Sequence, residues 1–239
     1  MSTVSAIPAG QTDHRRIALA GTLAELHRHR ILHQGVQPGS IFYDPASQSV
    51  TLIDFGAASQ LGAEGGGTIN LMDLGSALAY ISPEQTGRTA RAVDARTDLY
   101  SLGVTMFEML TGQRPFPERD PLALVYAHLA RPVPAVVALR PEVPAAVAAI
   151  LAQLLAKEPE QRYQTARGAG WDLEQALTQW RATGQVAPFA LGAQDHPPRL
   201  RLPQLLIGRE SEVGEVAAAY DRAAQGAVEL LLVGGPSGI

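Results

Sequence analysis

The chain contains 239 residues, of which 46% are apolar and 18% charged, and its formal net charge is −4 at pH 7. This composition is ordinary for a globular protein of one large or two small domains and argues against disorder throughout. It provides no overall basic field for nucleic acid or an anionic membrane, and the absence of cysteine excludes disulfides, thiolate metal sites and cysteine nucleophiles.

We expect no export signal in the N-terminal region, because its positive charges precede only a short apolar run that a glutamate interrupts. The longest strongly apolar segment, residues 143–156, is shorter than the roughly 18 residues that a membrane-spanning helix needs. We therefore expect a soluble chain in the cytoplasm, with no membrane span.

The first predicted helix runs through HRRIALAGTLAELHRHR and ends near Arg30, because apolar residues recur at helical spacing. The basic run at its end, residues 27–30, is interpreted as a solvated helix terminus. A loop with Gly35, Pro38 and Gly39 follows and leads into a hairpin of two short strands, residues 41–43 and 49–53. Residues 57–79 have little periodicity and predict a long loop.

The remaining pattern is helical. Residues 97–110 are apolar around nearly the whole circumference, which predicts a buried central helix that Asp98 is placed to cap. A short amphipathic helix, PLALVYAHLA, comes next, and another begins before Val147 and carries a stripe that ends at Leu155. The last helix of this region spans about residues 170–180. A Pro-rich linker over residues 181–204 then leads to a predicted helix, a buried strand and a Gly-rich turn.

Five segments carry a family resemblance, in order along the chain. HQGVQPGSI resembles the protein kinase catalytic loop His-Arg-Asp-Leu-Lys-Pro-x-Asn-Ile, LIDFG resembles the metal-binding Asp-Phe-Gly, and GSALAYISPEQ resembles the Ala-Pro-Glu end of the activation segment. Asp98, Ser101 and Gly103 match the start of the central helix, and KEPEQRYQT matches the segment whose arginine pairs with the Ala-Pro-Glu glutamate. Together they are similar to the C-terminal lobe of a bacterial serine/threonine protein kinase.

Two segments, ISPEQTGR and TDLYSLGVTMFEMLTGQRPF, make the resemblance more specific. They are similar to large bacterial signalling proteins in which an AAA-like ATPase domain follows the kinase domain. The tail is similar to the opening of such an ATPase. In that alignment its last five residues begin a Walker A phosphate-binding loop: Gly235, Pro236, Ser237, Gly238 and Ile239.

The resemblance implies an α+β, mostly α fold. After a tail at residues 1–14, a protein kinase-like C-lobe (a small hairpin plus a helical bundle) spans residues 15–180. The linker at 181–204 and the truncated start of an α/β P-loop NTPase domain at 205–239 complete this predicted organisation.

The resemblance also locates the chemistry. In an active kinase the loop aspartate accepts the substrate proton, a lysine stabilises the transferring phosphoryl group and an asparagine holds magnesium; these positions are occupied here by Gly35, Gln37 and Ser40. Gly35 has no side chain to accept a proton, Gln37 carries no charge, and Ser40 offers one neutral oxygen as a weaker cation ligand. No catalytic position is intact.

The residues to which the family assigns a structural or metal-binding role are retained in this sequence. Asp54 inherits magnesium ligation, and its alternative role is a turn residue bonded to the backbone before Gly56. His33 is expected to pack and bond to backbone with Phe55 beneath it as core, and Asp98 to hold the loop backbone. Glu84 and Arg162 are expected to form a buried ion pair, the alternative being two exposed charges worth little.

The family uses ATP and Mg²⁺, which it binds mostly with an N-terminal lobe, and no Gly-rich loop, strand lysine or helix glutamate precedes His14. We therefore expect a regulatory or interaction module that contacts protein partners or neighbouring ATPase and regulatory modules, and not nucleic acid. Two alternatives stay open: a truncated piece of an active ATP-dependent kinase or ATPase, and a relic that does not fold alone.

Overall fold

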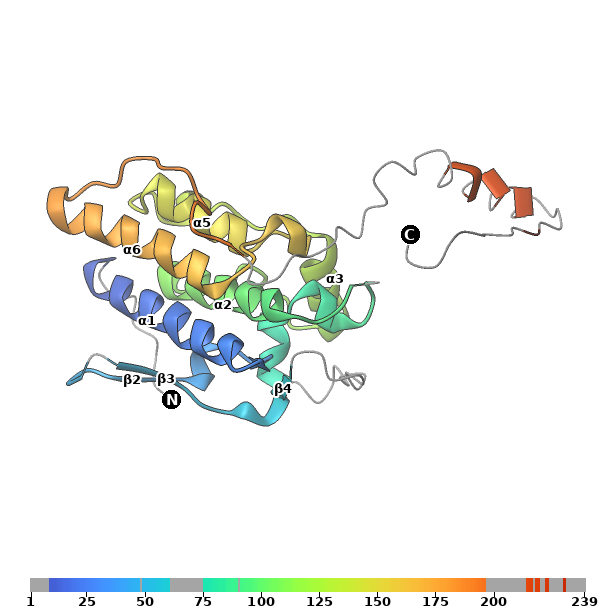
Figure 1. Cartoon of the computed structure of the whole chain (residues 1–239), viewed down its shortest axis with the longest axis horizontal. Helices are drawn as coiled ribbons and strands as arrows, with labels where there is room; N and C mark the ends of the chain where they lie inside the picture. Colours follow the sequence, from blue (N-terminus) through green and yellow to red (C-terminus); the bar gives the residue numbers. More distant parts are fainter. Residues whose placement is uncertain are drawn as a thin grey trace. The chain divides into compact units, whose positions relative to one another are not determined.

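A computed structural model describes residues 9–47, 49–60, 75–89 and 91–196, together with short pieces between 214 and 230. The chain divides into two compact units, Met1–Pro197 and Pro198–Ile239. The first unit is mostly helical, with a small hairpin beside the helices (Figure 1). This mixed, mostly α architecture is the one expected for the first unit.

The elements formed by the described residues of the first unit follow in chain order. Four strands lie near its start: β1 (Ile31–Leu32), β2 (Ile41–Asp44), β3 (Ser49–Leu52) and β4 (Ser59–Gln60). The helices are α1 (Ala9–Arg28), α2 (Ala95–Thr111), α3 (Pro121–Ala130), α4 (Val136–Leu139), α5 (Ala145–Leu154) and α6 (Ala166–Thr183). Five 3₁₀ turns join them: Pro38–Ser40, Phe55–Ala57, Gly75–Tyr80, Pro83–Thr86 and Pro159–Gln161.

The two small sheets frame the loop that carries the candidate site. Strands β2 and β3 form the predicted antiparallel hairpin, with Ile41 opposite Leu52. Strand β1 pairs with β4, which places Leu32 opposite Ser59. The β1–β4 pairing was not predicted, because a strand of two residues carries no alternating pattern.

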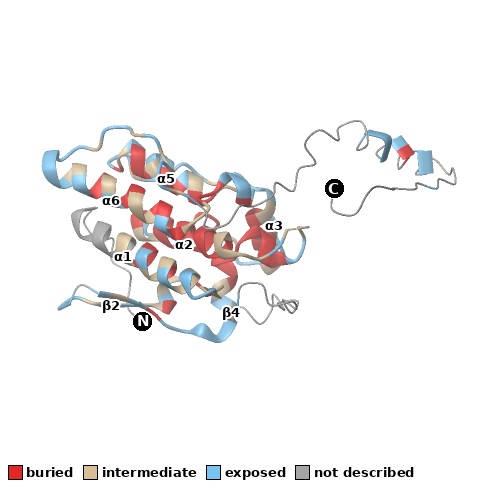
Figure 2. Ribbon diagram, viewed as in Figure 1, coloured by how far each residue is buried: buried red, intermediate tan, exposed pale blue. Residues whose placement is uncertain are grey.

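Helix α2 is the centre of the bundle, as its apolar circumference predicts. Buried residues are concentrated in α2 and the helices around it (Figure 2). Gly103 allows α2 to pack closely on α5, because a β-carbon there would lie 3.0 Å from side-chain atoms of Leu154 and Leu155. Helix α1 contacts α2 as well, and it packs against α6 and β3.

Several helix ends differ from their predicted positions. Helix α1 begins at Ala9, inside the predicted tail, and α6 begins at Ala166, capped by Thr165. Asp94, and not Asp98, caps α2: its carboxylate accepts from Arg96 N at 2.8 Å. Asp98 lies one turn further into the helix and is completely buried, so its carboxylate is free for a contact outside α2.

Part of the predicted linker packs on the bundle. We call residues 185–196 the C-terminal strap. Asp195 accepts hydrogen bonds from Gln164 N (2.6 Å) and from Thr165 N (2.8 Å) and Oγ1 (2.7 Å). A β-carbon at Gly168 would clash with the Asp195 carboxylate, so this glycine permits the close approach. The strap therefore covers the first turn of α6.

The second unit is described only in short pieces, of which residues 214–216, 218–219 and 222–223 are helical. The proposed phosphate-binding residues Gly235, Ser237, Gly238 and Ile239 lie outside the described residues. In the part of the chain that is described, no helix is long and apolar enough to cross a membrane.

Candidate functional site: the loop between β1 and β2

Asp98 fixes the start of the loop that resembles a catalytic loop. Its Oδ2 accepts from His33 N at 2.9 Å and its Oδ1 accepts from Gln34 N at 2.7 Å. Gln34 has a left-handed backbone with φ of 58°, a conformation that is uncommon for residues other than glycine. Two hydrogen bonds to one buried carboxylate hold this uncommon turn in place, which is the role expected for Asp98.

The Asp98 carboxylate has a third partner that the sequence analysis missed. His27 Nε2 lies 2.9 Å from Asp98 Oδ2, and the His27 side chain is only 12% exposed. The basic run at the end of α1 is therefore not uniformly solvated: Arg28, His29 and Arg30 are exposed, whereas His27 faces inward. Helical periodicity alone did not distinguish His27 from His29, because the partner is 71 residues away.

His33 is completely buried and is held from two sides. Its Nε2 lies 3.1 Å from the carbonyl oxygen of Ile53, so the tautomer that donates from Nε2 fits. The Phe55 ring lies against it, with 4.8 Å between ring centroids. Phe55 itself is 44% exposed, which corrects the expectation that it belongs to the core: one face covers His33 and the other meets solvent.

The three positions that the resemblance aligns with the chemistry of a kinase are Gly35, Gln37 and Ser40. Gly35 offers only its backbone, whose N–H lies 3.3 Å from His33 Nδ1. The Gln37 side chain is neutral, and its Oε1 accepts from Ser76 Oγ at a long 3.5 Å. The site therefore holds no general base at position 35 and no cation at position 37.

Ser40 is buried and is used by the loop itself. Its hydroxyl accepts from Gln37 N at 3.0 Å and can donate to Gly35 O (2.9 Å) or Gln37 O (3.0 Å). Because the side chain is 0% exposed, its oxygen does not face solvent. The expectation of a weak cation ligand at Ser40 is thus replaced by a structural role in closing the loop.

Asp54 presents an exposed carboxylate beside this loop. Its backbone is left-handed (φ 63°, ψ 66°), and within the described residues its side chain makes no hydrogen bond. The alternative role, a turn residue bonded to the following backbone, is therefore not seen. No group of three or more histidine, aspartate or glutamate side chains suited to a metal ion occurs among the described residues. One carboxylate can hold Mg²⁺ when substrate phosphates supply further oxygens.

The ion pair expected between Glu84 and Arg162 is present and buried. Nη1 and Nη2 of Arg162 donate to the two Glu84 oxygens at 2.7 and 3.0 Å. The remaining guanidinium donors reach three carbonyl oxygens, those of Ala156 (2.7 Å), Lys157 (2.9 Å) and Arg96 (3.1 Å). All five N–H groups are therefore paired, which is the condition for a buried guanidinium to be tolerated.

The activation-segment end contacts the loop directly as well. Gln85 Nε2 donates to Gln34 O at 3.0 Å, and Thr97 Oγ1 donates to Glu84 Oε1 at 2.8 Å. Neither polar residue was singled out from the sequence. The loop, the segment end and α2 are thus joined by hydrogen bonds into one framework.

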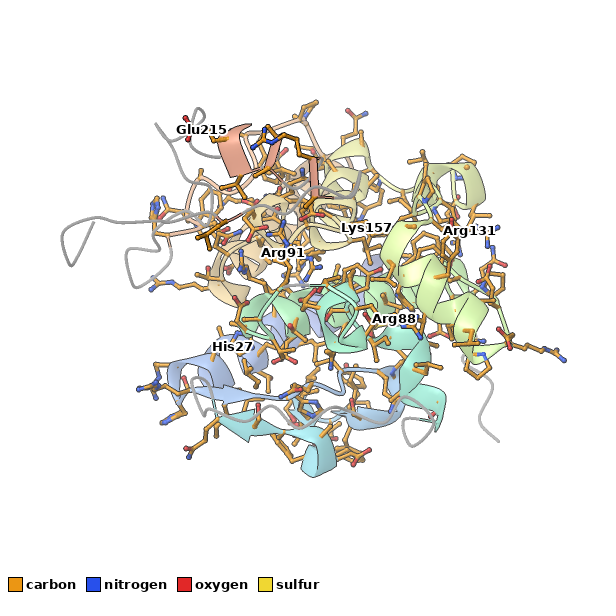
Figure 3. The ribbon with its side chains drawn as sticks, turned by 90° about the vertical axis from the view of Figure 1, so that its right-hand side faces the viewer. His27, Arg88, Arg91, Arg131, Lys157 and Glu215 are labelled. Atoms are coloured by element: carbon orange, nitrogen blue, oxygen red, sulfur yellow. The ribbon has the colours of Figure 1, made fainter. Side chains whose placement is uncertain are left out.

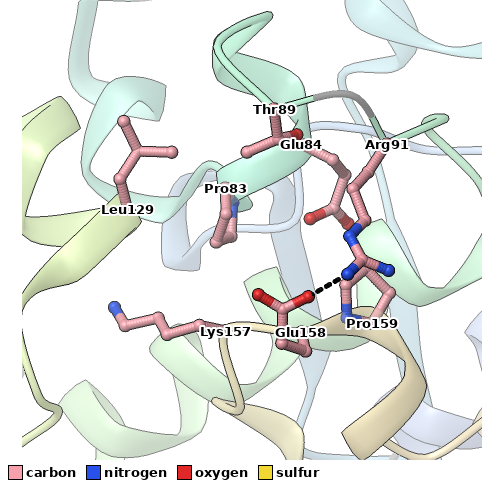
Figure 4. Close-up of a pocket in the computed structure, with 8 residues that line it drawn as sticks. All are labelled: Pro83, Glu84, Thr89, Arg91, Leu129, Lys157, Glu158 and Pro159. Atoms are coloured by element: carbon pink, nitrogen blue, oxygen red, sulfur yellow. Dashed lines mark ion pairs between the residues drawn. The ribbon is translucent and has the colours of Figure 1, made fainter. Parts of the chain in front are cut away.

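A shallow pocket opens behind the ion pair, between the segment end, α3 and the turn before α6 (Figure 4). Pro83, Leu129 and Pro159 line it together with Lys157, and Arg91 pairs with Glu158 at its edge. Lys157 Nζ donates to the carbonyl oxygens of Ala127 and His128 at 3.0 and 2.9 Å. Burial, with a smaller contribution from Arg162, lowers the pKa of Lys157 to about 8.

A small hairpin, a loop held from a central helix and a buried Glu–Arg pair fit the helical lobe of a protein kinase-like fold. Comparison with known proteins agrees, since residues 5–172 match the protein kinase domain family. The chain therefore belongs to the protein kinase family.

Three curated relatives illustrate the similarity. The hybrid signal transduction histidine kinase G of Dictyostelium discoideum is 37% identical over 67% of this chain and 5% of its own length. The serine/threonine-protein kinase PknB of Mycolicibacterium smegmatis is 36% identical over 62% of this chain and 23% of its own. A probable serine/threonine-protein kinase of Streptomyces coelicolor is 33% identical over 67% of this chain and 24% of its own. The chain thus spans a quarter or less of each relative.

Proposed function

We propose that this chain is a catalytically impaired, pseudokinase-like part of a kinase-type signalling protein, and that it regulates or contacts other proteins without transferring phosphate itself. The observation that carries the proposal is the loop at Gly35, Gln37 and Ser40. A missing general base reduces the rate about 10²- to 10⁴-fold. In addition, Ser40 uses its only oxygen to close the loop.

ATP and Mg²⁺ are the cofactors of the family, and magnesium would neutralise charge on the β- and γ-phosphates. Asp54 is the residue of this chain that would hold it, because its carboxylate is exposed beside the loop. The framework residues His33, Asp98, Glu84 and Arg162 would keep the loop shaped for binding a partner. The fold is retained while the groups that perform the reaction are replaced.

The second unit is proposed to be the start of an AAA-like P-loop ATPase domain. Its support is the sequence, in which a buried-type strand enters the turn with Gly235, Ser237 and Gly238. Backbone N–H groups in such a turn bind nucleotide phosphates. In this proposal the adjacent ATPase module is one partner of the kinase-like lobe, and the protein acts in the cytoplasm.

A labelling experiment tests the loss of activity. The purified chain is mixed with magnesium, radiolabelled ATP and a generic protein substrate, and an active serine/threonine kinase serves as the positive control. We expect no incorporation above background. Robust labelling that Asp54→Ala abolishes would overturn the proposal, because it would require the loop to support phosphotransfer as it stands.

The second candidate is that the chain is a piece of an active serine/threonine kinase or ATPase. The similarity to proteins named serine/threonine-protein kinases favours it. Sequencing the DNA on both sides tests it: a Gly-Lys-Ser/Thr codon run after Ile239 and a Gly-rich loop upstream of Met1 would establish this candidate. A third alternative, a relic that does not fold, is tested by circular dichroism, where a cooperative thermal transition would exclude it.

A further inference from the structure

Helix α3 turns an apolar stripe toward solvent. Among the described residues from 9 to 196, Leu122 (66% exposed) and Tyr126 (67%) are the two most exposed of the large apolar side chains. They are four positions apart, and Leu129 follows three positions later, so the three share one face of the helix. We call them the α3 stripe.

The fold does not use Leu122 and Tyr126, whereas Leu129 is partly buried and also packs against the core. The opposite face of α3 supplies its packing through Leu124, Val125, Ala127 and His128, all of which are buried. An amphipathic helix normally places charged or polar residues on the side away from the core. A helix that is apolar on both faces and exposed on one of them indicates an interaction surface.

The stripe leads into the pocket of Figure 4. Leu129 belongs to the α3 stripe and also lines the pocket, opposite Pro83 and Pro159. The stripe thus ends at the edge of a small recess whose lining is mostly polar, with Leu129 and two proline rings as its apolar part. A partner that lies along α3 can contact this apolar edge with one aliphatic side chain.

The unpaired charge around the stripe is positive. Arg119 stands before the N-terminus of α3 and Arg88 beside the pocket residue Thr89; both are exposed, and neither has an ion-pair partner in the described part of the chain. Arg131, at the C-terminal end, is 56% exposed and pairs with Glu118. Figure 3 labels Arg88, Arg91 and Arg131 on the side of the unit that faces the viewer.

The acidic residues nearby are already used. Asp120 caps α3 by accepting from Ala123 N at 2.7 Å. Glu158 and Glu160 both pair with Arg91, and Glu118 pairs with Arg131. Since the carboxylates are occupied and Arg88 and Arg119 are not, the surface favours a partner that brings negative charge.

We propose that the α3 stripe and its pocket form a docking site for an acidic amphipathic helix of a protein partner. The partner's apolar face covers Leu122 and Tyr126, one of its aliphatic side chains contacts Leu129 at the edge of the pocket, and its carboxylates meet Arg88 and Arg119. The proposal goes beyond the proposed function and is independent of it, because a kinase-type lobe can dock such a partner whether or not it transfers phosphate.

The binding test uses a fluorescein-labelled helical peptide with leucines at positions i, i+4 and i+7 and glutamates on both flanks. Fluorescence anisotropy with the full chain is expected to show saturable binding. The double variant Leu122→Ser/Tyr126→Ser is expected to weaken binding at least tenfold. The matched control, Val137→Ser/Leu139→Ser on α4, removes two apolar side chains of 40% exposure and is expected to bind as the original chain does.

Further experiments test the role of the two arginines and the identity of the partner that binds the site. Arg88→Glu/Arg119→Glu is expected to weaken binding and to reduce its salt dependence, which provides a second variant if the stripe variant fails to fold by circular dichroism. Three results would overturn the proposal: no binding of the acidic peptide, equal binding of a peptide with lysine in place of glutamate, or unchanged binding by the stripe variant. Self-association that sedimentation detects and the stripe variant abolishes would also overturn it, by assigning the site to a second copy of the chain.

Discussion

The stability of the fold depends on the buried charge of Arg162, which the surrounding residues neutralise. The guanidinium is buried, its five donors are paired, and it lies 4.8 Å from the centroid of the Tyr100 ring. Its removal would leave the Glu84 carboxylate buried and without a cation, with the Thr97 hydroxyl donating a hydrogen bond to one of its oxygens. The cost of that orphaned charge exceeds the value of the pair itself.

We therefore expect Arg162→Ala to lower the free energy of unfolding by about 3–5 kcal/mol. Urea denaturation followed by circular dichroism measures it. The control is Arg91→Ala, which removes a partly exposed arginine that pairs with Glu158 and Glu160 and is expected to cost no more than about 1 kcal/mol. A loss below half a kcal/mol for Arg162→Ala, on the order of experimental error, would contradict a buried pair.

The buried His128 makes the stability of the fold depend on pH. It is completely buried against Tyr100, and burial, with a smaller contribution from the charge of Lys157, lowers its pKa from 6.5 to about 3. As the pH falls below about 6.5, the unfolded chain binds this proton before the folded chain does, so stability decreases toward pH 3. The slope approaches about 1.4 kcal/mol per pH unit for one proton.

The test compares the original chain with His128→Gln in urea titrations at several pH values between 7 and 4. The difference in unfolding free energy between them is expected to shrink as the pH falls, because only the original chain carries this proton linkage. His196→Gln, at an exposed histidine, is expected to track the original chain at every pH. A difference that stays constant with pH would show that His128 titrates normally in the folded state.

The motifs predicted His33, Asp98, Glu84 and Arg162 because each role is tied to a fixed place in a family pattern. They did not predict His27 or Asp94. Both histidines of the run at the end of α1 fit a solvated helix end, and only the tertiary position of Asp98 distinguishes them. Asp94 and Asp98 both precede apolar residues at helical spacing, so the sequence could not decide which of them caps α2.

At the scale of an element, the packing of α2 on α5 depends on the absence of a side chain at Gly103. We expect Gly103→Val to lower the unfolding free energy by about 1–3 kcal/mol, because its branched side chain must displace Leu154 and Leu155. The control is Gly21→Ala in α1, where a β-carbon meets no atom within 4 Å. It is expected to stabilise the chain by about 1 kcal/mol through helix propensity alone. Equal effects of the two substitutions would contradict the close packing.

The longer elements were predictable and the shorter ones were not. Helices α2, α3, α5 and α6 and the β2–β3 hairpin follow from apolar periodicity, which operates over several residues. The β1–β4 pair joins residues 31–32 to residues 59–60, and neither segment is long enough to show a period. The left-handed backbone of Gln34 is likewise held by a distant contact, the hydrogen bond from its N–H to the Asp98 carboxylate.

At the scale of the whole chain, the sequence and the structure differ over where the first unit ends. Composition predicts a linker from residue 181 because prolines and polar residues replace the helical period. The structure instead continues α6 to Thr183 and packs Phe189 and Leu191 against the core before Asp195 reaches α6. A strap of this kind has no periodic pattern, and its anchoring aspartate is recognisable only beside Thr165 and Gly168.

The strap therefore predicts which shortened chains fold well. A chain that ends at Pro197 retains Asp195 and is expected to keep the thermal transition of the first unit. A chain that ends at Gly184 loses the hydrogen bonds to Gln164 and Thr165 and the packing of the strap. At about 2–4 °C per kcal/mol, its midpoint is expected to fall by about 5–10 °C.

Circular dichroism at 222 nm can follow both transitions, and Asp195→Ala in the chain ending at Pro197 separates the hydrogen bonds of Asp195 from the packing of the strap. The substitution is expected to account for about 0.5–2 kcal/mol of the loss, because the hydrogen bonds to this carboxylate disappear. The remainder should then come from Phe189 and Leu191, which pack partly buried on the core. If the chain ending at Gly184 melts at the same temperature as the longer one, the strap contributes nothing to the fold and the linker interpretation holds.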